Sequence, residues 1–155
     1  MNKALFEEFY PKIYNFVYYR VLHKEKAEDI TGDIFIKALT NADKFDGNKA
    51  AYSTWLFTIS RNCIANYYRD KKNEIAIDDV ELVSEDDADS ALFLDEEKKR
   101  LHMILRGMGE RDRTVLSLRY WGGFSYSEIA EHMGITVNSV GVTLKRAVKK
   151  IRDAW

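Results

Sequence analysis

The segment from Ser125 to Val140 limits the fold more than any other part of the chain, because it carries start and stop signals for two consecutive helices. Ser125 and Glu128 form the pattern of a capping box, in which each side chain satisfies a backbone N–H of the first turn. Gly134 then supplies the left-handed turn conformation that residues with a side chain disfavour. Thr136 is suited to capping a second helix. The pattern predicts a helix, a tight turn and another helix.

The second helix of this pair is predicted to be amphipathic. Val140, Leu144, Val148 and Ile151 recur at helical spacing and are expected to be buried. A plain helical hairpin would explain the pattern, but its place in a basic segment favours a helix-turn-helix that binds duplex DNA. Asn and Arg can bind base edges, and Lys and Ser can reach phosphates. The expected DNA contacts are Ser125, Thr136, Asn138, Ser139, Val142, Thr143, Lys145, Arg146 and Lys149.

The net charge of −1 conceals a strong segregation of charge along the chain. Residues 1–73 carry a balance of +3, residues 74–97 carry −11, and residues 98–155 carry +7. Basic segments attract polyanions, whereas the acidic segment has too little apolar surface to fold alone. The sequence therefore predicts an all-α protein with two small helical domains, 1–73 and 92–155, joined by an acidic flexible linker over 74–91. The second is expected to be a four-helix domain containing the helix-turn-helix.

Three helices are predicted in the first domain. The first contains Pro11, which should mark either a kink or the true first turn. The second follows a break at 23–26, and the third begins at a cap on Ser53 or Thr54 and ends near Lys72. Two short apolar pieces in the linker, 75–77 and 80–83, either dock on a partner or are plain linker. The second domain is expected to contain helices over 92–106, 110–120, 125–133 and 136–152.

Several function classes have little support in the sequence. The three His residues are scattered and Cys63 is alone, so neither a metal site nor a disulfide is indicated. A phosphate-binding Gly loop is also missing. We therefore expect no enzyme activity, no catalytic residue and no cofactor. No apolar run approaches the length of a membrane span, and the acidic N-terminal segment is unlike a secretion signal, so the cytoplasm is the expected compartment.

Three stretches together resemble a known family. Residues 110–130, from Glu110 to Ala130, resemble the fourth conserved region of the sigma-70 family of RNA polymerase sigma factors. Residues 27–38 resemble the helix of the second region that docks on core polymerase, and residues 54–62 resemble the helix that meets the −10 promoter element. Both modules occur in the family's order, and the lack of a third region between them is typical of the extracytoplasmic-function (ECF) type.

The resemblance implies partners and site residues. It implies that the chain binds core RNA polymerase and promoter DNA and directs transcription initiation, and that an anti-sigma protein restrains it. Asp29, Asp33 and Phe35 would then dock on the basic clamp helices of the polymerase. The helix-turn-helix would bind the −35 element. Trp55 and Tyr68 would either stack on DNA bases or belong to the core. The residues implied at the −10 element are Asn48, Arg61, Asn62, Asn66 and Arg69.

The chain also departs from the family pattern. Gly107-Met108-Gly109 stands where Leu-Pro is usual, and Gly141 and Thr143 stand where basic residues are common. We therefore expect a less electrostatic contact with the −35 element, in which more of the binding is carried by Asn138, Ser139, Thr143 and Arg146. Two alternatives stay open: a helix-turn-helix regulator that does not touch polymerase, and a sigma-like decoy that binds polymerase without starting transcription.

Overall fold

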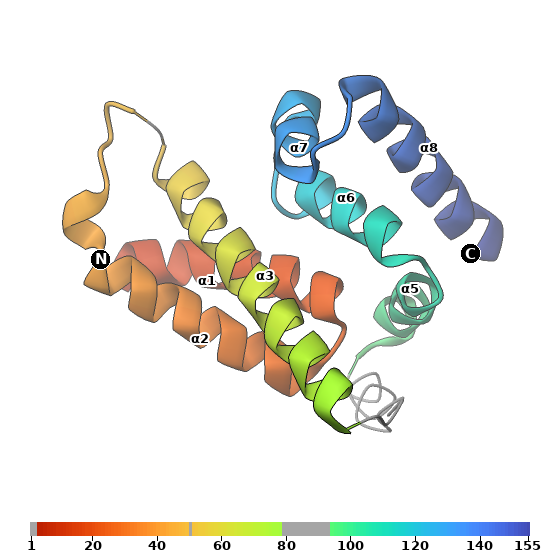
Figure 1. Ribbon diagram of the computed structural model, residues 1–155, viewed down its shortest axis with the longest axis horizontal. Helices are drawn as coiled ribbons and strands as arrows, with labels where there is room; N and C mark the ends of the chain where they lie inside the picture. Colours follow the sequence, from red (N-terminus) through yellow and green to blue (C-terminus); the bar gives the residue numbers. More distant parts are fainter. Residues whose placement is uncertain (1–2, 50, 79–93) are drawn as a thin grey trace.

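The structure, a computed structural model, describes residues 3–49, 51–78 and 94–155. Every regular element within these ranges is helical, which confirms the prediction of an all-α protein. We find no helix in the described ranges with the length and apolar character of a membrane span. The helices form two modules that lie side by side (Figure 1).

The first module consists of α1 (Lys3–Val21), α2 (Lys24–Thr40) and α3 (Tyr52–Asp78), with a short 3-10 helix, η1 (Ala42–Lys44), after α2. All three α-helices pack on one another. Their inward faces meet at the fully buried side chains of Ile13, Phe16, Val17, Ile34 and Leu56. The apolar spacing noted in the sequence therefore produces a three-helix core.

The helix boundaries in this module differ from the predicted ones. α2 begins at Lys24, because His23 caps it by accepting a hydrogen bond from the Lys26 backbone N–H at 3.2 Å. α3 begins at Tyr52 and continues to Asp78, past the predicted end near Lys72. The predicted linker therefore starts within a helix, and its remainder, 79–91, lies outside the described residues together with position 92, where the next helix was expected to begin.

Pro11 lies inside α1 rather than at its first turn. Its missing N–H removes one helical hydrogen bond, to the carbonyl of residue 7. The residue is exposed, so water can satisfy that carbonyl. Apolar burial of Phe9 and Ile13 on the opposite face of the same helix offsets the local loss.

The second module consists of α5 (Glu96–Arg106), α6 (Glu110–Tyr120), α7 (Tyr126–Met133) and α8 (Val137–Ala154). This confirms the predicted four-helix domain. α8 packs against each of the other three helices. The core contains Leu105, Leu116, Ile129, Val140 and Ala147, all of them buried.

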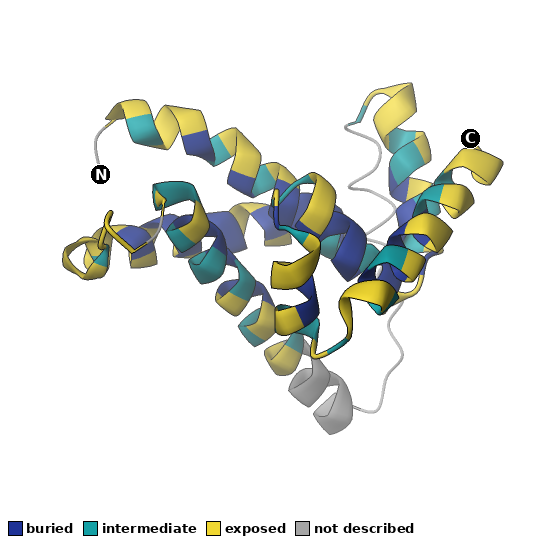
Figure 2. Ribbon diagram, turned by 90° about the horizontal axis from the view of Figure 1, so that it is seen from above, coloured by how far each residue is buried: buried dark blue, intermediate teal, exposed yellow. Residues whose placement is uncertain are grey.

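The two modules contact each other directly, chiefly where α1 packs on α6. The rings of Tyr19 and Trp121 stack with centroids 4.4 Å apart. Ser117 Oγ donates a hydrogen bond to the Phe16 carbonyl at 3.2 Å, and Figure 2 shows buried residues on the helix faces that meet here. We call this contact, between α1 and α3 on one side and α5, α6 and α7 on the other, the seam.

Candidate nucleic-acid interface

The turn between α7 and α8 has the geometry that its sequence predicts. Ser125 Oγ accepts from the Glu128 N–H at 3.1 Å, and Glu128 Oε1 accepts from the Ser125 N–H at 3.0 Å, which completes the capping box. Gly134 has φ 67° and ψ 34°, in the left-handed region. Thr136 Oγ1 accepts from the Ser139 N–H at 3.0 Å and so caps α8. The helix-turn-helix is therefore confirmed as a structural unit.

Four side chains of α8 form an exposed stripe along one face of the helix. Asn138, Val142, Lys145 and Lys149 follow one another at steps of three or four residues, and all are exposed. The Val142 side chain is 57% exposed. We call these four residues the α8 stripe. It combines an amide that can bind base edges, an apolar group suited to a thymine methyl, and two cations for phosphates.

Thr143 lies elsewhere. It is only 3% exposed, so it lies on the side of α8 that packs into the second module. The prediction that Thr143 belongs to the solvent face is therefore wrong. Ser125, Thr136 and Ser139, which were also expected to contact DNA, have hydroxyls that take part in the two helix caps.

Asp112, which the sequence did not single out, is the centre of a charge cluster in this module. Its carboxylate, 7% exposed, accepts from Arg146 Nη2 at 2.5 Å and Nε at 3.2 Å, and from Lys150 Nζ at 3.0 Å. A bidentate arginine–carboxylate pair is directional, so it fixes α8 against the start of α6. Asp112 lies 34 residues before Arg146 and 38 before Lys150, so no helical spacing reveals its place in the cluster.

The charge cluster has electrostatic consequences for its members. Hydrogen bonds from Arg146, and then from Lys150, hold the pKa of the Asp112 carboxyl below its ordinary value, although burial acts in the opposite direction. Arg146 was predicted as a DNA contact, yet its guanidinium is already engaged with Asp112. Its side chain remains 52% exposed, so its outer edge faces solvent.

In the first module, the structure gathers part of the residues predicted at the −10 element. Asn62 and Arg69 are exposed on one face of α3, beside the half-buried Asn66, whose Oδ1 accepts from Arg69 Nη2 at 3.0 Å. Asn48 is exposed in the loop that precedes α3, where its backbone N–H donates to Asp46 Oδ1 at 2.9 Å. Arg61 differs from these, because its half-buried side chain faces α7 across the seam.

Neither of the two aromatic residues considered for base stacking is freely exposed. Trp55 is half-buried, with ring centroids 5.4 Å from Phe45 and 5.6 Å from Tyr52. Tyr68 donates from its hydroxyl to the Arg20 carbonyl at 2.8 Å, and the Arg20 guanidinium lies over its ring at 4.8 Å. Tyr68 therefore belongs to the packing between α1 and α3.

The surface of α2 carries the residues expected to bind polymerase. Asp29 and Asp33 are exposed and line a groove of about 390 Å³ between α2 and α3, together with Lys37, Cys63 and other residues. Phe35 is 4% exposed and packs on Phe6 and Tyr10 of α1, so the prediction that it contacts a partner is wrong.

Two exposed apolar residues on α2 were missed. Ile36 is 62% exposed and Leu39 is 54% exposed, and both lie near the acidic pair. Their exposure beside charged groups leaves apolar surface that a partner could cover. The spacing of Ile30, Ile34, Ala38 and Leu39 in the sequence predicts one buried apolar stripe, and the exposure of Leu39 departs from it. Among the described residues, no cluster of three or more His, Cys, Asp or Glu side chains is placed to hold a metal ion.

Comparisons with known proteins agree with this arrangement. The family model for sigma-70 region 2 matches residues 5–74, and the model for sigma-70, region 4 matches residues 98–151. The RNA polymerase sigma factor YlaC of Bacillus subtilis (strain 168) is 32% identical over 148 residues, which cover 92% of this chain and 85% of YlaC. The ECF RNA polymerase sigma factor SigW of the same strain is 30% identical over 153 residues, 91% of this chain and 81% of SigW.

A solved structure has a similar fold. This structure is the sigma factor RpoE of Bartonella quintana in complex with the anti-sigma factor NepR, with a TM-score of 0.75 and 22% sequence identity. The match covers 98% of this chain and 94% of the RpoE chain. The two family matches fall on the two helical modules, in the same order along the chain. On the strength of these matches and of relatives at least 30% identical, the chain belongs to the sigma-70 family of RNA polymerase sigma factors, in its ECF group.

Proposed function

We propose that this chain binds core RNA polymerase through α2 and directs transcription initiation at promoters whose −10 element contacts α3 and whose −35 element contacts α8. The observation that carries the proposal is the exposed α8 stripe, presented by a capped helix-turn-helix on the same chain as an acidic, partly apolar α2 surface. A regulator that acts on DNA alone has no use for the second surface.

Each surface has the chemistry of its proposed partner. Asp29 and Asp33 complement basic clamp helices, and Ile36 and Leu39 add apolar contact area. Asn62, Asn66 and Arg69 on α3, with Asn48, are the residues proposed at the −10 element. The α8 stripe, with Arg146 at its margin, is proposed to bind the −35 element. This role requires no catalytic residue, since DNA melting draws on binding energy.

The proposed role requires the modules to separate. The elements at −10 and −35 are about 25 base pairs apart, which is roughly 85 Å along B-form DNA. In the closed arrangement Tyr19 and Trp121 hold the modules in direct contact, and we propose that this arrangement is too compact to span the distance. We propose that core polymerase binding, in the cytoplasm, favours the open form.

An anti-sigma protein is the proposed restraining partner. The RpoE structure and that of CnrH, which is 21% identical with a TM-score of 0.62, were each solved with a bound partner, NepR or the cytosolic domain of CnrY. The exposed Ile36 and Leu39 give a partner of this class an apolar surface on α2.

Run-off transcription with core polymerase tests the proposal against its two alternatives. A sigma factor makes core polymerase start at a defined promoter. A regulator yields no transcript with core polymerase and binds duplex DNA alone, and a decoy binds core polymerase and starts nothing. Mapping the transcript starts made by the reconstituted holoenzyme would identify both promoter elements.

A further inference from the structure

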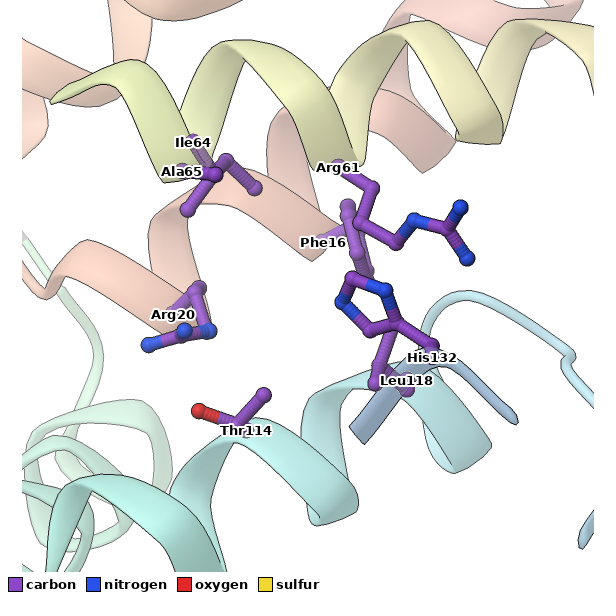
Figure 3. A pocket seen from close by; sticks show the side chains of 8 residues that line it. All are labelled: Phe16, Arg20, Arg61, Ile64, Ala65, Thr114, Leu118 and His132. Atoms are coloured by element: carbon purple, nitrogen blue, oxygen red, sulfur yellow. The ribbon is translucent and has the colours of Figure 1, made fainter. Parts of the chain in front are cut away.

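We propose that the seam contains a binding site for a small oxyanion of the phosphate class, formed by Arg20, Arg61 and His132. These residues come from α1, α3 and α7, so the site exists only while the modules are closed. Figure 3 shows the three side chains at the walls of one pocket, with the guanidinium group of Arg61 directed to the side away from Arg20.

The pocket has the size and walls of a small-ion site. Its cavity of about 50 Å³ can hold about three water molecules, and therefore a single small oxyanion. The apolar walls are formed by Phe16 and Ile64 of the first module and Leu118 of the second. Apolar walls lower the local dielectric constant and so strengthen an ionic contact at the centre.

The strongest argument for an anion is a shortage of hydrogen-bond acceptors. Arg20 Nη1 and Arg61 Nε are both buried, and neither has a hydrogen-bond partner among the residues that the structure describes. The carboxylate nearest to Arg20 is that of Glu110, whose Oε1 lies 3.9 Å from Arg20 Nη1 on a side chain that is 62% exposed. Buried guanidinium groups normally have acceptors, and an oxyanion would supply them.

The charges around the pocket point the same way. Arg113 lies close to Arg20, and its Nε donates to the Arg20 carbonyl at 3.2 Å, so it adds positive charge without supplying an acceptor. Burial and the nearby Arg61 and Arg20 lower the pKa of His132 to about 4. The imidazole is therefore neutral at neutral pH and still has one N–H donor.

Donors that come from three helices favour a ligand with acceptors in several directions. A tetrahedral oxyanion offers four oxygens, and guanidinium groups bind such oxygens strongly. A cation would be repelled by Arg20 and Arg61, and an apolar ligand would leave their nitrogens unsatisfied. An oxyanion would also offset the repulsion between Arg20 of α1 and Arg113 of α6 across the seam and so stabilise the closed form.

The regulatory consequence rests on the proposed function. Arg61 is among the residues that the sequence predicts at the −10 element, and an anion in the pocket would hold it against α7. Phosphate binding would therefore oppose promoter binding, whereas the anion site itself does not depend on that role.

Titration of the full-length chain with inorganic phosphate tests the site. Isothermal titration calorimetry at constant ionic strength, set with chloride, should give one site per chain. Arg61→Gln should weaken phosphate binding about tenfold or more, because it removes a charge-assisted hydrogen bond. Arg69→Gln is the matched control on the same helix, because Arg69 is exposed outside the pocket, and it should leave the affinity unchanged.

Two further measurements place the site at the seam. Phosphate should raise the pKa of His132, followed by proton NMR of its imidazole, because an anion offsets the two guanidinium charges. Trp121→Ala, which loosens the seam, should weaken phosphate binding. Equal affinity in wild type and Arg61→Gln would overturn the proposal. So would phosphate binding that Trp121→Ala leaves unchanged, since that result would confine the site to one module.

Discussion

Tyr19 of the first module and Trp121 of the second stack with an interplanar angle of 16° and ring centroids 4.4 Å apart. An aromatic pair of this kind contributes about 0.5–1.5 kcal/mol beyond the area that it buries. The pair therefore contributes to the free energy that keeps the modules closed.

Trp121→Ala should open the chain. We expect a larger radius of gyration by small-angle X-ray scattering, because the stacking energy is lost from the closed form only. Binding to core polymerase should become up to about tenfold tighter, since a larger fraction of the chain is already in the competent state. Trp155→Ala, at an exposed residue of the C-terminus, is the control. An unchanged radius of gyration would show that the stack does not hold the seam.

Asp112→Asn should destabilise the second module by about 1–3 kcal/mol. The substitution removes the charged acceptor of Arg146 and Lys150. Both side chains are about half exposed, so water can solvate them after the change, which limits the loss of stability. Chemical denaturation measures the free energy of unfolding. Asp153→Asn is the control, because the Asp153–Lys149 pair lies on the exposed surface and contributes little. Equal effects of the two substitutions would contradict the structural role of Asp112.

The same carboxylate predicts a pH dependence. The pKa of Asp112 is lower in the folded chain than in the unfolded chain, so its contribution to stability is fully present above the unfolded value of about 4. That contribution should be lost as the pH falls through the folded pKa. Thermal unfolding of wild type and Asp112→Asn should therefore converge toward pH 3. A difference in Tm that stays constant from pH 7 to pH 3 would refute this assignment.

Gly141→Ala should stabilise the chain by about 1 kcal/mol, or about 2–4 °C in Tm. A Cβ at this helical position would meet the Tyr126 ring at 3.8 Å, an ordinary contact. Gly134→Ala is the opposite case, because φ there is +67° and a side chain is strained. It should destabilise by about 1–2 kcal/mol. The two variants must shift Tm in opposite directions if the turn geometry is as described.

Lys145→Ala and Lys149→Ala should each reduce the salt dependence of DNA binding. A lost phosphate contact lowers the slope of log K against log salt by about 1 and weakens binding to all sequences alike. Asn138→Ala should instead relax sequence preference at one base pair. Lys12→Ala, on the exposed surface of α1, is the control. Fluorescence anisotropy at several salt concentrations gives these slopes, and unchanged slopes for both lysine variants would contradict the α8 stripe.

Local signals predicted the second module well. The Ser125–Glu128 capping box, the turn at Gly134 and the cap at Thr136 act within a few residues, so short-range geometry determines them. The α6 bounds, Glu110–Tyr120, also match the prediction. The end of α3 was missed, because no stop signal follows Lys72 and the helix continues to Asp78.

Side-chain placement was less predictable. Helical periodicity gives the angular position of a residue but not what packs on its flanks. Thr143 was expected on the solvent face of its helix and Phe35 at a contact with polymerase, yet Thr143 is buried and the aromatic rings of α1 cover Phe35. The Asp112–Arg146 pair and the Tyr19–Trp121 stack join residues distant in sequence. Such contacts follow from the tertiary arrangement, which no local pattern encodes.

The seam couples the binding of a partner at α2 to the binding of DNA at α8. Any partner that prefers the open form must separate Tyr19 from Trp121. The next partner then binds a chain that is already open, so its binding no longer includes the free energy of opening. Core polymerase bound at α2 would therefore raise the affinity of α8 for DNA, and DNA at α8 would raise the affinity of α2 for polymerase by the same factor. A substitution at the stack would reduce that mutual factor without touching either binding surface.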